Sequence, residues 1–300
     1  MNYKMMGRFI AQILLLEAIF MIPATFISLY CGEYRSVFAF LGTMALLVLI
    51  SGVLWFFCKA AKSNFYATDG MVCVALSWLI LSLAGSLPFL FSGAIPRFID
   101  ALFEIVSGFT TTGASILPAV EGLPKGILYW RSFSHWVGGM GVLVFLLAIV
   151  PSTDQGKGFT MHLLRAESPG PSVGKLVPKM RKTAAILYFL YIILTIADFC
   201  FLLLGGMPAF EALCNAFGTA GTGGFGVRND SFASYSPYLQ NVTTVFMFLF
   251  GVNFSCYYLL MLRQWGAVFK DEELRAYFGI ALCSALLITW NVRGLYGSLG

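Results

Sequence analysis

Seven apolar runs of membrane-spanning length are the dominant feature of the sequence. A hydrocarbon core about 30 Å thick requires roughly 20 apolar residues in a helix. The runs that reach or approach this length are 9–31, 37–60, 71–93, 126–150, 184–204, 242–262 and 274–291. Only 11% of all residues are charged, too few to cover a surface that faces water. The sequence therefore predicts an all-α integral membrane protein and argues against a soluble enzyme or a nucleic-acid-binding domain.

The positions of Lys and Arg predict the orientation of these runs. Segments on the cytoplasmic side of a membrane carry an excess of both residues. With a cytoplasmic N-terminus, thirteen of the 19 Lys and Arg residues fall on the inner side and six, Arg131 among them, on the outer side. We therefore expect a multi-pass protein of the inner (cytoplasmic) membrane with its N-terminus in the cytoplasm. The net charge of +5 has the same origin and implies no nucleic-acid partner.

Two further apolar runs are too short to cross a bilayer. They cover residues 98–109 and 209–217, and each ends in a stretch rich in Thr and Gly. Each also follows one spanning run and precedes another. The chain therefore contains one unit twice: a spanning helix, a short re-entrant helix, a turn and a second spanning helix. Duplicated units of this kind are typical of transport proteins, whose ion or substrate site lies between the repeats.

The two Thr/Gly stretches can be aligned with each other. The first reads Gly-Phe-Thr-Thr-Thr-Gly-Ala-Ser over 108–115, and the second contains Ala-Gly-Thr-Gly-Gly-Phe over 220–225. The Thr-Gly pair at 112–113 matches the pair at 222–223 with an offset of 110, whereas the acidic residues that open the short helices match with an offset of 111. This alignment predicts that the second copy lacks one residue between its short helix and its turn.

Turns of this composition can coordinate a monovalent cation with backbone oxygens. Glycine adopts positive φ without steric cost, so successive carbonyls can point the same way. A ring of carbonyls replaces the water shell of K⁺ in potassium filters, and the carboxyl end of a short helix adds partial negative charge. Neither turn contains a carboxylate, which favours a weakly hydrated ion over Ca²⁺ or Mg²⁺. An ordinary extracellular turn is the alternative for either stretch alone, and the duplication argues against it.

At these residues the chain resembles the Trk/Ktr/HKT superfamily of potassium transporters, most closely its bacterial TrkH-type membrane subunits. The matching stretches are Ser-Gly-Phe-Thr-Thr-Thr-Gly-Ala at 107–114, Trp-Val-Gly-Gly-Met-Gly-Val at 136–142, Thr-Gly-Gly-Phe at 222–225 and Gly-Val-Asn-Phe at 251–254. The resemblance covers essentially the whole chain. It implies repeated helix–pore-helix–filter-turn–helix units of the potassium-channel type, preceded by two extra helices.

The resemblance also implies a set of site residues and partners. Backbone carbonyls that would bind K⁺, the transported ion, belong to Thr111, Thr112, Gly221 and Thr222. Residues that would complete the filter are Thr110, Gly113, Ala220 and Gly223, with Gly113 and Gly223 as the filter glycines. No cofactor is implied. The expected partners are the lipid membrane, a second copy in a homodimer and a cytosolic nucleotide-binding regulatory subunit of the TrkA type.

The expected organisation has five parts. Two N-terminal helices occupy 1–65, the first pore repeat 66–152, a basic cytoplasmic loop 153–183, the second pore repeat 184–264, and the first helix of an incomplete third repeat 265–300. The superfamily builds its pore from four units, whereas this sequence contains two complete ones, so we expect it to be a fragment. The expected function is potassium uptake, with coupling to H⁺ or Na⁺ left open. The alternatives are a Na⁺-permeable or poorly selective cation pathway and, if 300 residues is the true length, a non-conducting assembly subunit.

Several polar and small residues within the apolar runs have two interpretations. Gly138, Gly139 and Gly141 could form a hinge, but close packing between membrane helices is favoured. Asn253 either faces the pore below the second turn or makes a hydrogen bond between helices. His135 is expected near the outer end of its helix as an interfacial hydrogen-bonding group. Because the sequence shows no clustered nucleophile and base, a membrane enzyme acting on lipid-linked substrates is not expected.

Acidic residues within or beside the apolar runs are also singled out. Glu17 and Asp198 are ionisable groups inside spans, which makes them functional candidates, and packing or hydrogen-bonding roles are favoured for both. Asp100, Glu104 and Glu211 open or lie on the short helices. There they can stabilise helix amino ends and concentrate cations at the mouth of a pathway.

Overall fold

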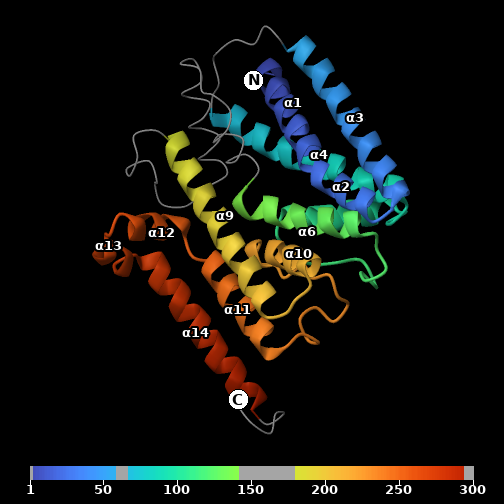
Figure 1. The fold of residues 1–300 in the computed structure, drawn as a ribbon. Coiled ribbons are helices and arrows are strands. Elements are labelled where there is room, and N and C mark those ends of the chain that lie inside the picture. Colours follow the sequence, from blue (N-terminus) through green and yellow to red (C-terminus); the bar gives the residue numbers. More distant parts are fainter. Residues whose placement is uncertain (1–2, 59–66, 142–179, 294–300) are drawn as a thin grey trace.

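The computed structural model describes residues 3–58, 67–141 and 180–293, and every regular element in these ranges is a helix (Figure 1). The helices are α1 (Tyr3–Phe20), α2 (Ile22–Tyr30), α3 (Tyr34–Phe57), α4 (Ala67–Ser92), α5 (Phe98–Phe109), α6 (Lys125–Met140), α9 (Met180–Leu204), α10 (Ala209–Ala220), α11 (Pro237–Phe250), α12 (Phe254–Met261), α13 (Trp265–Phe269) and α14 (Glu272–Val292). Most of the predicted basic loop 153–183 lies outside the described residues.

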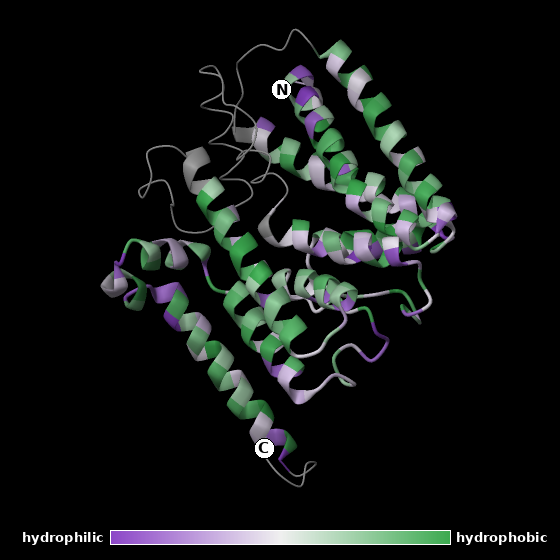
Figure 2. Ribbon diagram, in the orientation of Figure 1, coloured by the Kyte–Doolittle hydropathy of each residue, from purple (hydrophilic) through white to green (hydrophobic). Residues whose placement is uncertain are grey.

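Five of the predicted spans are confirmed as helices long and apolar enough to cross a membrane. They are Tyr3–Tyr30, which comprises α1 and α2, then α3, α4, α9 and α14. Hydrophobic residues cover these helices along most of their length, and hydrophilic residues gather at their ends and in the loops (Figure 2). The chain is therefore a multi-pass, all-α membrane protein, as the apolar runs predict.

The predicted span 242–262 is not one helix, which corrects the sequence-based expectation. Its two halves, α11 and α12, are separated by residues 251–253 and bent by 86° relative to each other. Asn253 starts α12, because its side-chain oxygen accepts a hydrogen bond from the Ser255 backbone N–H at 2.9 Å. Asparagine is among the preferred residues at the start of a helix. The Asn253 side chain therefore favours a new helix start inside the apolar run.

Tyrosine hydroxyls donate hydrogen bonds to two backbone carbonyls beside this break, and one of these, the Leu249 carbonyl, also accepts from the Val252 backbone N–H at 3.2 Å. The Tyr257 hydroxyl donates to the Leu249 carbonyl at 2.7 Å, and the Tyr277 hydroxyl of α14 donates to the Phe248 carbonyl at 3.0 Å. An unpaired carbonyl at membrane depth costs several kcal/mol. The two hydroxyls therefore make the bend compatible with a membrane interior.

The predicted span 126–150 is described only as far as residue 141. Its helix, α6, ends at Met140, and Gly141 follows with φ +77°. A left-handed residue of this kind commonly ends a helix. The second half of the predicted run, 142–150, lies outside the described residues. Gly141 is thus a helix-ending residue, whereas Gly138 and Gly139 lie within α6.

Helix α6 packs against both short helices, α5 and α10. A Cβ on Gly138 would overlap the Phe109 carbonyl at the end of α5, and a Cβ on Gly139 would lie 3.2 Å from the Ala220 carbonyl at the end of α10. Adjacent glycines therefore allow α6 to approach the carboxyl ends of both short helices. This confirms the close-packing interpretation of the two glycines, which is common between membrane helices.

Helix α14 differs from the other spans because none of its residues is buried. It lies apart from α1–α4, on the far side of α9 and α11 (Figure 1). Its links to the rest include the Tyr277 hydrogen bond at the α11–α12 break and packing against α13. Its remaining apolar surface is open to lipid or to further protein.

The glycine contact between α6 and α5 generates a prediction about stability. Gly138→Ala forces a methyl group into the Phe109 carbonyl, and such overpacking typically costs about 1–3 kcal/mol. We expect a lower melting temperature in detergent. Gly52→Ala in α3 is the matched control, because no atom lies within 4 Å of its added methyl group. Equal melting temperatures for the two variants would contradict the close packing.

Candidate ion-binding site

The two short helices end at the same place in the molecule. Their bounds, Phe98–Phe109 and Ala209–Ala220, differ by 111 at both ends. Both carboxyl ends lie beside the adjacent glycines of α6. Each carries about half a negative charge on its unpaired carbonyls, so two partial negative charges converge where the two turns begin. Ala220, predicted as part of the turn, is the last residue of α10.

The backbone of the two turns also follows an offset of 111. Thr111 and Thr222 have φ values of +54° and +59°, and Gly113 and Gly224 have +73° and +67°. The predicted one-residue deletion is therefore wrong, because helix α10 and its turn keep the register of α5. Gly224, rather than Gly223, is the structural counterpart of Gly113. The Thr-Gly pairs match by letter but occupy different places in the turn.

Thr111 and Thr222 are unusual because they are β-branched residues in the left-handed region. For residues other than glycine this conformation costs roughly 1–2 kcal/mol, and it persists only where the surrounding structure enforces it. The same strained conformation recurs at equivalent positions of both repeats. The surrounding structure therefore enforces the same strained backbone in both repeats.

The two turns are in direct contact. A Cβ on Gly113 would overlap the Gly223 carbonyl, and a Cβ on Gly223 would lie 2.8 Å from the Thr111 carbonyl and against the His135 ring. Only glycine fits at either position. The structure thus brings residues 110–113 and 221–223 together, with carbonyl groups of both turns at their contact. Thr112 is held in its turn by a hydrogen bond from its N–H to the Ser107 carbonyl at 2.9 Å.

His135 supports the second turn instead of lying at a membrane interface, which corrects the prediction. It lies well inside α6, and its side chain is completely buried. Its ring centroid is 5.1 Å from that of Phe225 in an edge-on arrangement, and a Cβ on Gly221 would lie 2.7 Å from the ring. The sequence predicts His135 near the outer end of its helix, but it lies ten residues after Lys125, where α6 begins.

Arg131, which the predicted topology counts among the residues of the outer side, is buried in the structure. It is 3% exposed, and its Nε lies 2.6 Å from Oε1 of Glu104, which is 0% exposed. The guanidinium donates to the Gly226 carbonyl at 2.8 Å and lies 3.4 Å from the Phe225 ring centroid. The sequence contains a signal for this pair, because Glu104 and Arg131 carry opposite charges within two neighbouring apolar runs.

Charge pairing in the second repeat is more exposed. Glu211 opens α10, and its carboxylate lies 2.9 Å from Arg228 and accepts a hydrogen bond from Tyr235 at 2.5 Å. Burial, together with this bond to Glu211, raises the pKa of Tyr235 to about 12, so the hydroxyl remains a donor. The Glu211 carboxylate therefore binds side chains of the loop after the turn, and Glu211 also lies at the amino end of α10.

Three other predicted residues have clear positions. The Asn253 amide donates to Oε2 of Glu273 on α14 at 2.8 Å, which confirms a hydrogen bond between helices. Glu17 is buried against Gly85, where a Cβ would lie 2.9 Å from its carboxylate, as expected for a packing role. Asp198 is completely buried in α9.

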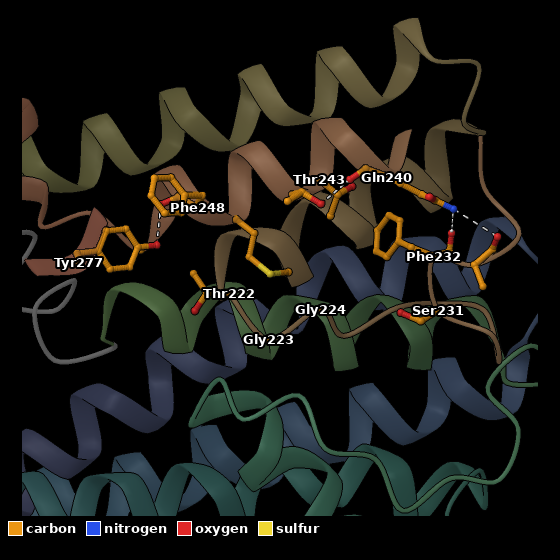
Figure 3. A pocket seen from close by; sticks show the side chains of 13 residues that line it. Thr222, Gly223, Gly224, Ser231, Phe232, Gln240, Thr243, Phe248 and Tyr277 are labelled. Carbon is orange, nitrogen blue, oxygen red and sulfur yellow. Dashed lines mark hydrogen bonds between the residues drawn. The ribbon is translucent and has the colours of Figure 1, made fainter. Parts of the chain in front are cut away.

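A cavity of about 870 Å³ opens beside the second turn (Figure 3). Its walls come from the turn itself, the following loop, α11 and Tyr277 of α14. Thr222, Gly223 and Gly224 form one side, and Gln240 and Thr243 of α11 form the facing side. In the described residues no three His, Cys, Asp or Glu side chains group as metal ligands. The cavity lining offers a cation backbone carbonyls, hydroxyls and the side-chain amide oxygen of Gln240.

The fold and the paired turns define the class of the protein: a multi-pass membrane protein whose two re-entrant helix–turn units meet, as in ion-transport proteins. A family model described as TrkH, cation transport protein, matches residues 36–292. The chain therefore belongs to the TrkH family of cation transport proteins, which are transporters and not enzymes. This confirms the resemblance to the Trk/Ktr/HKT superfamily.

Characterised relatives share this similarity over most of the chain. The Trk system potassium uptake protein TrkH of Salmonella typhimurium is 35% identical over 255 residues, which are 84% of this chain and 52% of that protein. The corresponding TrkG of Escherichia coli K12 is 32% identical over 289 residues, covering 94% and 58%. The crystal structure of the potassium transporter TrkH from Vibrio parahaemolyticus matches with a TM-score of 0.83 and 30% identity, covering 100% of this chain and 61% of that one. The chain spans about half the length of the curated relatives.

The backbone of the turns generates a second prediction. Gly113→Ala introduces both a strained φ and an overlap with the Gly223 carbonyl, and Gly224→Ala introduces the strained φ alone. In the complete gene product, we expect cation uptake, followed with Rb⁺, to be abolished by the first change and reduced by the second. Gly226→Ala is the control, because its nearest neighbour is 3.6 Å away and its φ is ordinary. Normal uptake by Gly224→Ala would contradict the assigned register.

Proposed function

We propose that this chain moves K⁺ across the cytoplasmic membrane through a filter lined by backbone carbonyls, as the ion-translocating part of a Trk-type uptake system. The observation that carries the proposal is the contact between the two turns at the carboxyl ends of two short helices. Family membership and the names of the relatives support the choice of K⁺. A carbonyl-lined site needs no chemical step: it offsets the loss of ion hydration and then releases the ion.

The resemblance and the structural register of the two turns give overlapping sets of carbonyls that we propose bind the ion. The resemblance implies Thr111, Thr112, Gly221 and Thr222, with Thr110, Gly113, Ala220 and Gly223 completing the filter. The constant offset of 111 pairs Thr111 with Thr222 and Thr112 with Gly223. It therefore favours adding Gly223 to the ligand set, because a symmetric site requires matched carbonyls from matched positions. Gly221 keeps a helical backbone at the end of α10.

Electrostatics supports a monovalent ion that binds briefly. Two helix carboxyl ends contribute about half a negative charge each, and no carboxylate lies in residues 110–115 or 221–226. A site with full carboxylate charges would hold a divalent cation more tightly than throughput allows. A site with only partial charges can compensate dehydration and still release the ion.

The two turns account for half of a four-part ring. We propose that the remaining carbonyls come from equivalent turns in the rest of a longer protein, or from a second chain. We further propose the inner membrane with a cytoplasmic N-terminus, a homodimer, and a cytosolic nucleotide-binding regulatory subunit of the TrkA type. The names of the relatives as Trk system proteins support a system of more than one component, and the excess of Lys and Arg in the predicted inner segments supports the orientation.

Ion flux tests the proposed function. Cells without their own potassium uptake should grow at low K⁺ when they carry the complete gene, and they should take up Rb⁺ in preference to Na⁺. The matched negative control is the Gly113→Ala variant at the same membrane level. Uptake of Na⁺ as fast as Rb⁺ would instead support a poorly selective cation pathway, and no uptake of either ion would overturn the proposal.

A further inference from the structure

We propose that the buried Glu104–Arg131 ion pair braces the two turns against each other and thereby sets their preference among cations. The inference rests on the proposed function, because it explains how this chain would keep the carbonyl spacing that distinguishes one ion from another. Neither residue lies in a turn. They act as positioning residues, one in each of the two elements that enclose the first turn.

Glu104 fixes the chain that leaves the first turn. Its carboxylate accepts a hydrogen bond from the Ser115 hydroxyl at 2.9 Å and one from the Ile116 backbone N–H at 3.0 Å. Glu104 itself lies in α5, the helix that enters the same turn. The entry and the exit of the turn are therefore tied together by one carboxylate, which leaves residues 110–114 between them little freedom.

Arg131 fixes the second turn from the first repeat. Its Nη1 donates to the Gly226 carbonyl at 2.8 Å, and its guanidinium lies 3.4 Å from the Phe225 ring centroid, within the range of a cation–π contact. Both contacts lie directly after Gly224. Because α6 supplies Arg131, the helix of one repeat holds the turn of the other, and the ion pair with Glu104 connects both supports.

Burial gives this pair a strength that a surface pair lacks. The side chains are 4% and 0% exposed for Arg131 and Glu104, against 33% and 26% for Arg228 and Glu211 in the second repeat. Exposed pairs contribute little, whereas a buried charge that loses its partner is strongly destabilising. Glu104 also neutralises a positive charge that lies next to the proposed cation path. Without it, the guanidinium would repel cations and its contacts to the second turn would shift.

The ratio of Rb⁺ to Na⁺ uptake tests the inference, because the ratio does not depend on how much protein reaches the membrane. In the complete gene product, Glu104→Gln should lower this ratio roughly tenfold, which corresponds to about 1.4 kcal/mol of differential ion binding. Arg131→Lys keeps the charge but not the fork geometry of the guanidinium, and should lower the ratio less. Glu33→Gln is the control and should leave the ratio unchanged. Glu33 also binds α6, the helix of Arg131, but it does so at the start of that helix, where its carboxylate accepts hydrogen bonds from the backbone N–H groups of Lys125 and Gly126.

Phe225→Leu keeps the test decisive if Glu104→Gln does not fold. It removes the ring beneath the guanidinium and leaves the ion pair intact, so it should reach the membrane and lower the ratio. A wild-type ratio in Phe225→Leu, or in any membrane-inserted Glu104→Gln, would overturn the brace while leaving the proposed function standing. Wild-type protein that carries neither ion would overturn the proposed function, and this inference with it.

Discussion

The contact of α6 with the carboxyl ends of both α5 and α10 is the interaction on which the rest of the structure depends. Gly138 and Gly139 remove the side chains that would hold these helices apart. The two short helices can then end within the same small volume, and their turns meet. Without that approach each turn would be a separate loop, and no shared set of carbonyls would exist.

The repeats share a backbone but not the side chains that support it. Both turns place threonine and glycine in the left-handed region at equivalent positions. The first repeat surrounds its turn with a buried ion pair, whereas the second relies on a half-exposed pair and on an arginine, Arg131, supplied by its neighbour. Turns with equivalent backbones can therefore be supported by different sets of side chains.

Much of this architecture is predictable from the sequence, because hydrocarbon thickness limits helix length. Apolar run lengths identify five spans, and the bounds of α5 match the short run 98–109. The duplicated unit predicts that the two turns meet. The alignment of the two turns could not be predicted, because the sequence alignment matched the two Thr-Gly pairs and did not reveal that α10 extends to Ala220. The break at 251–253 was missed because hydropathy does not record a local capping bond such as that of Asn253. The burial of Arg131 and His135 was not predicted, because hydropathy does not show which face of a helix other helices cover.

The left-handed threonines have a consequence for any attempt to transplant this site. A threonine keeps a φ of +54° or +59° only where packing of the surrounding atoms enforces that backbone conformation. A short peptide that copies either turn would relax into another conformation and lose the carbonyl directions of the native turn. An engineered host protein would need α6 and its glycines as well as the loops. The geometry of the proposed ion site thus depends on tertiary packing, and the turn sequence alone is too short to specify it.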